Sequence, residues 1–188
     1  VWQALDSVSC TDFLPNLKAK VSGTIGINAA HISGFAWGDW SLTKPGYLTF
    51  DFTKWKEAVD LGDIGRLSRI VIHEFTHIFN ADRDSNPKYW TEFQSLAAKQ
   101  GVFSSYAGKN NLETLPEVVG YYVARCAKDN PYDTGKFNDY YEWVKTNIFA
   151  GREFGPAPGT KASCDVTQDQ IPTPEPSTPD WVKALSGE

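Results

Sequence analysis

His73-Glu74-Phe75-Thr76-His77 lies inside a longer stretch, residues 63–79, which carries the strongest helical pattern in the chain. Apolar residues recur there at spacings of three and four, as on the core-facing side of an amphipathic helix. They are Ile64, Leu67, Ile70, Val71, Phe75 and Ile78. A polar run that begins at Asn80 ends the pattern. The stretch therefore predicts a long helix that packs on a core and turns a different face to a cleft.

The two histidines of this segment are spaced for metal binding. A helix turns about 100° per residue, so His73 and His77 project from the same face and can reach one zinc ion. Glu74 lies beside them, where its carboxylate can act as the general base of a peptidase. The third histidine of the chain, His31, lies in a glycine-rich stretch and is expected to be structural. The motif predicts a Zn2+ site.

A third ligand has to come from elsewhere, because catalytic zinc sites have three protein ligands and one open position. The extended HExxHxxGxxH form is absent, since Asn80 and Arg83 stand where its glycine and histidine would be. A carboxylate is the remaining choice. The next long predicted helix offers Glu113 and Glu117.

A tyrosine and these two glutamates follow the motif with the spacing Tyr-x6-Glu-x3-Glu, at Tyr106, Glu113 and Glu117. With this spacing, residues 67–125 resemble the anthrax lethal factor family of zinc peptidases, which includes small secreted Pro-Pro endopeptidases. The resemblance implies a zincin-like fold of the gluzincin type and a zinc-dependent endopeptidase activity.

The resemblance also implies a role for each residue of the motif. It implies zinc ligands at His73, His77 and Glu113, a general base at Glu74, a transition-state stabiliser at Tyr106 and a ligand-orienting carboxylate at Glu117. Tyr121 and Tyr122 are the alternatives to Tyr106.

One departure from the family leaves the third ligand open. The family has a small or apolar non-proline residue before the second glutamate, whereas this chain has Pro116. Because proline is tolerated in a first helical turn, Thr114 is expected to cap a helix that runs to about Lys128. Glu113 would then lie just before the helix, and Glu117 could be the ligand instead. The spacing of the family motif favours Glu113 as the third ligand, whereas the expected cap at Thr114 favours Glu117.

The remaining pattern predicts a single α+β domain. The first fifty residues have the pattern of strands and turns, with alternating apolar residues over 21–28 and 47–52. The second of these strands is predicted to offer an edge to an extended substrate. Further helices are predicted over residues 53–60, 88–100 and 114–128, and from a cap at Thr134 to about Ile148. A small N-terminal sheet and the active-site helix are thus followed by a helical C-terminal half.

The domain is predicted to occupy residues 1–154. Residues 155–188 are rich in proline, which disfavours helices and central strands, and are predicted to form an extended tail or linker. Three cysteines allow one disulfide. A bridge that involves Cys164, with either Cys126 or Cys10, would hold this tail.

Charge and composition exclude some classes of partner. The net charge of -5 and the pI of about 5.2 argue against nucleic acid or an anionic membrane as the main partner. No apolar run approaches the roughly 18 residues of a membrane span. Because the chain starts at Val1 without methionine, we expect a processed, secreted protein. A monomer that acts on peptide or protein substrates is predicted.

Two other functions are compatible with the sequence. The first is a catalytically inactive relative that keeps the zinc and binds peptides, although an intact Glu74 argues against it. The second is an extracellular carbohydrate-binding module that uses the aromatic residues of segment 35–40. Aromatic runs of this kind lie more often in a core.

Overall fold

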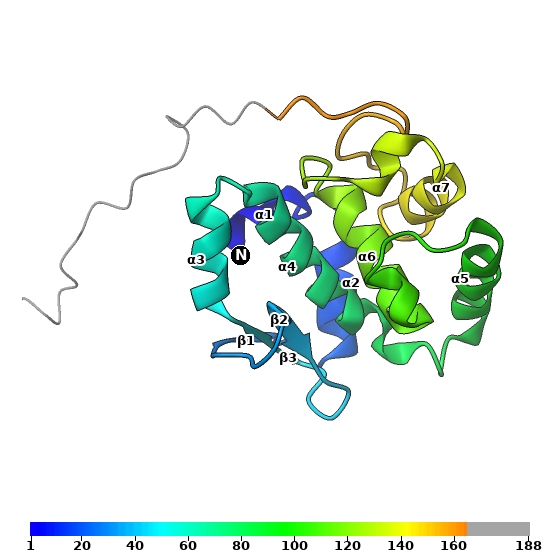
Figure 1. The fold of residues 1–188 in the computed structure, drawn as a ribbon. Helices are drawn as coiled ribbons and strands as arrows, with labels where there is room; N and C mark the ends of the chain where they lie inside the picture. The colour runs from blue at the N-terminus through cyan, green and yellow to red at the C-terminus, as the bar shows by residue number, and fades with distance from the viewer. Residues whose placement is uncertain (165–188) are drawn as a thin grey trace, which may run out of the picture.

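The helix predicted around the histidine motif forms the centre of the molecule (Figure 1). The computed structural model describes residues 1–164, in which α4 (Ile64–Phe79) contacts the sheet and helices both before and after it in the chain. Asp63 caps this helix, because its carboxylate accepts a hydrogen bond from the backbone N–H of Arg66 at 3.2 Å. The apolar residues that it buries are Ile70, Val71, Ile72, Phe75 and Ile78. The predicted α+β class is confirmed, with a small sheet and several helices.

A three-stranded sheet lies beside α4 and turns one apolar face toward the core. Its strands, in the spatial order β1-β3-β2, are β1 (Gly26–Ala29), β2 (Gly38–Trp40) and β3 (Tyr47–Phe50). β3 pairs in parallel with β1 and antiparallel with β2. Leu48 and Phe50 are fully buried, whereas Tyr47 and Thr49 between them are more exposed. This alternation is that of a strand with one buried face.

The strand order corrects the prediction that residues 47–52 offer a free edge to a substrate. β3 is the central strand, so both of its edges are paired, and the edge strands are β1 and β2. Strand order depends on contacts between distant segments, which local alternation does not encode. The strand also ends earlier than predicted. Asp51 instead caps α3 (Phe52–Asp60), where its carboxylate accepts a hydrogen bond from the backbone N–H of Thr53 at 3.1 Å.

The first twenty residues form two helices, where the sequence pattern predicted strands and turns. α1 (Trp2–Ser7) and α2 (Phe13–Lys20) both contact α4. Phe13 and Leu17, one helical turn apart, are fully buried. The prediction was wrong because helices this short are not stable alone and depend on the core on which they pack.

After α4 the described chain is mainly helical. Its elements are η1 (Asn80–Asp82), α5 (Pro87–Gln100), η2 (Ala107–Lys109), α6 (Asn111–Val123), η3 (Pro131–Thr134) and α7 (Asn138–Asn147). Thr134 does not cap the last helix, as was predicted. Its hydroxyl donates to the carbonyl oxygen of Pro131 at 2.8 Å within η3, and Phe137 immediately precedes α7. Among residues 1–164, no helix combines the length and the apolar character that a membrane crossing requires.

α6 begins earlier than predicted, and its cap is Asn110 rather than Thr114. The side-chain oxygen of Asn110 accepts a hydrogen bond from the backbone N–H of Glu113 at 3.1 Å. The Thr114 hydroxyl donates instead to the carbonyl oxygen of Ala107 at 3.0 Å. Pro116 therefore lies inside the helix, where it removes one backbone hydrogen bond. As a consequence, Glu113 lies in the first turn of α6 and not before it.

The first part of the proline-rich stretch is attached to the domain in two ways. Arg125, whose side chain is buried, donates a hydrogen bond to the carbonyl oxygen of Thr160 at 3.0 Å. Cys126 forms a disulfide with Cys164, so the predicted bridge at Cys164 is confirmed and its partner is identified. Cys10 is a free, exposed thiol. The remainder of the predicted tail, from residue 165 on, lies outside the described residues.

Gly65→Ala should lower the free energy of unfolding by about 1–3 kcal/mol, although alanine is normally the better helix former. The first turn of α4 lies against the backbone that follows α6, and a Cβ at position 65 would stand 2.5 Å from the carbonyl oxygen of Cys126. Urea denaturation measures the change. Ser68→Ala in the same helix is the control and should shift it by less than about 0.5 kcal/mol. Unchanged or increased stability of Gly65→Ala would contradict this close approach.

Candidate metal centre

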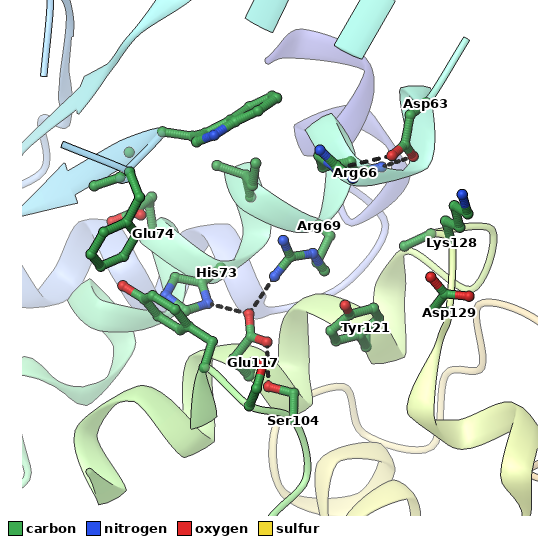
Figure 2. Close-up of a pocket in the computed structure, with 18 residues that line it drawn as sticks. Asp63, Arg66, Arg69, His73, Glu74, Ser104, Glu117, Tyr121, Lys128 and Asp129 are labelled. Atoms are coloured by element: carbon green, nitrogen blue, oxygen red, sulfur yellow. Dashed lines mark hydrogen bonds and ion pairs between the residues drawn. The ribbon is translucent and has the colours of Figure 1, made fainter. Parts of the chain in front are cut away.

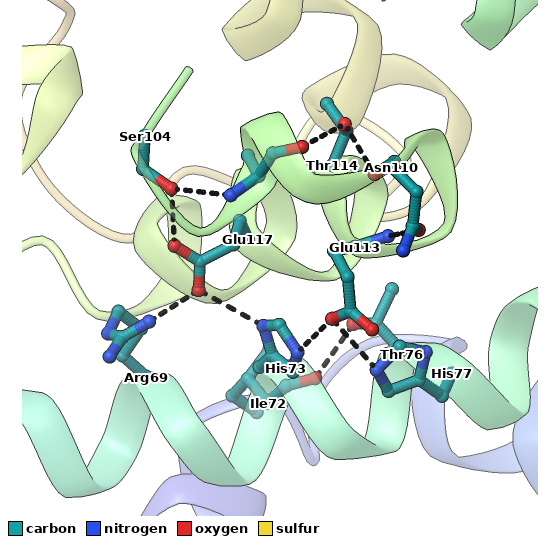
Figure 3. A network of polar contacts seen from close by, with 11 residues as sticks. Arg69, Ile72, His73, Thr76, His77, Ser104, Asn110, Glu113, Thr114 and Glu117 are labelled. Carbon is teal, nitrogen blue, oxygen red and sulfur yellow. Dashed lines mark hydrogen bonds and ion pairs between the residues drawn. The ribbon is translucent and has the colours of Figure 1, made fainter. Parts of the chain in front are cut away.

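Two histidines of α4 and one glutamate of α6 point toward a common centre (Figure 3). Ligand atoms of His73, His77 and Glu113 all lie within 4.8 Å of one another. One carboxylate oxygen of Glu113 is 3.2 Å from Nε2 of His73 and 3.6 Å from Nε2 of His77. These three residues, called the metal group below, can hold a metal ion. They come together because the first turn of α6 packs across α4.

Glu117 lies on the opposite side of the His73 ring from Glu113. Its Oε1 accepts a hydrogen bond from Nδ1 of His73 at 3.1 Å, and its side chain is only 2% exposed. Glu113 is therefore the carboxylate that faces both Nε2 atoms. Glu117 is placed to orient the His73 ring.

The surroundings shift the pKa values of the two histidines in opposite directions. Burial alone would lower the pKa of His73, but the carboxylates of Glu113 and Glu117 outweigh it and raise that pKa to about 9. Burial lowers the pKa of His77, which has fewer compensating contacts. Burial of Glu113 is opposed by its hydrogen bonds to both imidazoles, which hold the pKa of that carboxyl well below its usual value.

Glu74 is buried next to the two histidines, and its carboxylate lies against strand β2. Burial raises the pKa of its carboxyl to about 7, and the nearby carboxylate of Glu113 adds to this effect. It packs against Gly38 of β2, where a Cβ would stand 2.6 Å from the Glu74 Oε1 atom. A glycine at this position thus lets the edge strand approach the carboxylate. Proximity and pKa suit Glu74 for proton transfer near neutral pH.

A cleft of about 350 Å³ opens beside His73 and Glu74 (Figure 2). Tyr106 lies in its wall, and its ring centroid is 5.7 Å from that of His73 in an edge-to-face arrangement. Burial raises the pKa of Tyr106 to about 12, so the hydroxyl keeps its proton at neutral pH and remains a hydrogen-bond donor.

The two alternative tyrosines occupy different places. Tyr122 is fully buried, and its hydroxyl donates to the carbonyl oxygen of Arg152 at 2.6 Å, which separates it from the metal group. Tyr121 lines the cleft, where the guanidinium of Arg69 lies 4.9 Å from its ring centroid. Of the three candidate tyrosines, Tyr106 is the one whose ring contacts His73.

The aromatic segment 35–40 lies at the same site. The ring of Trp40 stacks on His77, with centroids 5.4 Å apart and planes inclined by 3°. Trp37 lines the cleft, and Phe35 is 68% exposed at its rim. His31 is not part of the metal group, since its Nδ1 lies 3.0 Å from the Asp51 carboxylate.

Three residues of the site were missed by the sequence reasoning. They are Arg69, Gly38 and Ser104. Arg69 could have been found, because it precedes His73 by one turn and therefore shares its helix face. Gly38 and Ser104 had no such signal, since each reaches the site through the path of a loop or strand.

Comparisons with known proteins gave no match. No protein-family model matches the chain, and neither the curated proteins nor the solved structures yielded a similar one. The functional argument therefore depends on the residues and geometry of the site.

Zinc binding at pH 8 should release about one proton, because His73 is protonated below its pKa of about 9 and must lose that proton to coordinate a metal. His77, whose pKa is lowered, has no proton to lose at this pH. Raising the pH above the His73 pKa should lower the number of protons released by about one, because His73 is then already neutral. Calorimetric titration in buffers of different ionisation enthalpy counts the protons. Zinc binding without proton release at pH 8 would contradict the assigned state of His73.

Proposed function

We propose that this chain is a secreted zinc-dependent endopeptidase. The observation that carries the proposal is the convergence of His73, His77 and Glu113 within 4.8 Å, with the buried Glu74 beside them in the wall of a cleft. Each of these features alone is common in proteins that are not enzymes. Together they provide a metal group, a base and a space for substrate.

The donor set fits zinc. Two imidazole nitrogens and one carboxylate oxygen form a known ligand set of catalytic zinc sites, and the Glu117 carboxylate on Nδ1 of His73 is the usual support for such a ligand. When bound, zinc supplies Lewis acidity, which polarises a peptide carbonyl and makes a water molecule more acidic. His73, His77 and Glu113 would hold it.

Glu74 supplies the proton transfer. With a pKa of about 7, its carboxylate accepts a proton from the attacking water and then donates it to the nitrogen of the leaving amine. Contact with Gly38 keeps the carboxylate between the metal group and the edge strand. Such a base is poised for both transfers, since it is neither a strong acid nor permanently protonated at neutral pH.

Tyr106 supplies a hydrogen-bond donor in the wall of the cleft. Because its pKa is about 12, the phenol is neutral and can donate to the oxyanion that develops on the substrate carbonyl. Its edge-to-face contact with His73 keeps the ring close to the metal group.

An extended peptide is the substrate that this cleft favours. β2 is an edge strand whose Gly38 and Trp40 contact Glu74 and His77, so a peptide paired along β2 would pass beside the metal group. A central helix with two ligands, an edge strand beside it and a third ligand from a later helix support a zincin-like architecture of the lethal factor type. The Cys126–Cys164 disulfide supports an oxidising compartment, and we propose that the protein acts there as a monomer.

Glu74→Gln should lower kcat/KM by about 10²- to 10⁴-fold and leave zinc binding intact, because it removes a base but no ligand. Digestion of a mixed peptide library, read by mass spectrometry, measures cleavage, and metal analysis after dialysis measures zinc. Glu92→Gln, at an exposed position on α5, is the control and should match the wild type. Equal cleavage by Glu74→Gln and wild type would remove Glu74 from the mechanism. Zinc without any cleavage by the wild type would favour the inactive peptide-binding alternative.

Tyr106→Phe should lower kcat by about 10²- to 10³-fold, as loss of one oxyanion donor does in other hydrolases, with little change in KM. The reason is that the phenol acts on charge that is present in the transition state and not in the bound substrate. Steady-state kinetics on a cleaved library peptide separate the two constants. Tyr47→Phe, on an exposed face of β3, is the matched control. A change confined to KM would assign Tyr106 to substrate binding alone.

A further inference from the structure

The buried carboxylate of Glu117 has three partners from three parts of the chain (Figure 3). Its Oε1 accepts hydrogen bonds from the guanidinium of Arg69 and from Nδ1 of His73. Its Oε2 accepts a hydrogen bond from the hydroxyl of Ser104 at 2.7 Å. Both oxygens are therefore fixed, so the carboxylate cannot rotate without losing a partner.

Two of these three donors, Arg69 and Ser104, are themselves held in place. The guanidinium of Arg69 lies over the ring of Tyr121 at 4.9 Å, and its side chain is 19% exposed (Figure 2). The oxygen of Ser104 accepts the backbone N–H of Ala107 at 3.0 Å, which leaves its proton for Glu117. Arg69 and Ser104 thus reach Glu117 from opposite sides with little freedom of their own.

We propose that Arg69 and Ser104 are positioning residues of the metal centre, an inference that rests on the proposed zinc site. They hold the Glu117 carboxylate on Nδ1 of His73, so that the ring keeps Nε2 directed at the metal group. The nitrogen that a histidine offers to a metal is set by the hydrogen bond that the other nitrogen makes. A buried carboxylate that loses its cationic partner seeks another arrangement, because an unpaired buried charge is costly.

α4 provides a matched control for this role. Arg66 precedes Arg69 on the same helix, and its guanidinium pairs with Asp63 at 2.9 Å rather than with Glu117. Removal of either arginine deletes the same charge from the same helix, one turn before His73 for Arg69 and about two turns before it for Arg66. A general effect of charge or helix stability would therefore appear in both variants, whereas a positioning effect is confined to Arg69.

The experiment compares Arg69→Gln, Arg69→Lys, Ser104→Ala and Arg66→Gln by zinc competition with a chelator. Arg69→Gln should weaken zinc affinity by about 10- to 100-fold, the usual effect of losing support for a ligand, and Arg69→Lys should restore part of it. Ser104→Ala should weaken affinity less, since it removes a neutral hydrogen-bond donor and not the positive charge that compensates the buried carboxylate. Arg66→Gln should stay close to the wild type. Equal affinities for Arg69→Gln, Arg66→Gln and wild type would overturn the proposal.

Crystal structures of the metal-free wild type and Arg69→Gln provide a second readout. We expect the Glu117 carboxylate to rotate or shift relative to the His73 ring in the variant, and an unmoved carboxylate would overturn the proposal. Should the wild type bind no zinc, the proposed function falls, while these structures still decide whether Arg69 positions Glu117. Should Arg69→Gln not fold, Arg69→Lys and Ser104→Ala decide the question, because both keep most of the packing of the residue that they replace.

Discussion

Two carboxylates from α6 contact the two nitrogens of one histidine ring on α4, and the rest of the site is arranged around this contact. Glu113 lies 3.2 Å from Nε2 of His73, and Glu117 lies 3.1 Å from Nδ1. The two glutamates are one helical turn apart, so they share a face of α6 and lie on either side of the ring. The crossing of α4 and α6 thus determines which carboxylate faces the possible metal position and which one contacts the other nitrogen of His73.

Such a concentration of charge in a buried place requires compensation. Glu117 is almost completely buried, and burial by itself would raise the pKa of its carboxyl. The hydrogen bond to His73 and the charge of Arg69 nevertheless hold that pKa below its usual value. Within residues 1–164, Glu74 has no such partner in direct contact, and burial raises its pKa to about 7. The pKa of Glu117 is therefore lowered and that of Glu74 is raised, because Glu117 receives close hydrogen-bond donors and Glu74 does not. A structural support and a base near neutral pH can arise side by side in this way.

Elements outside the crossing complete the site. β2 covers the histidine face of α4, with Gly38 against Glu74 and Trp40 stacked on His77. The loop that follows α5 brings Ser104 to Glu117 and Tyr106 to the ring of His73. Neither segment contributes to the group of His73, His77 and Glu113, yet together they form walls of the cleft beside it. A binding space next to the metal group therefore depends on packing between segments that are distant in sequence.

The sequence by itself determined α4 and its histidine face, because helix periodicity and i,i+4 spacing are local properties. It did not determine the start of α6, where Thr114 and Pro116 suggested one cap and Asn110 provides another. Only the path of α6 across α4 shows that Glu113, and not Glu117, faces the Nε2 atoms of both histidines. The free edge was assigned to the wrong strand for a similar reason, since the order of strands depends on pairing between distant segments. Local chemistry fixes which side chains share a face, whereas packing between elements decides which faces meet.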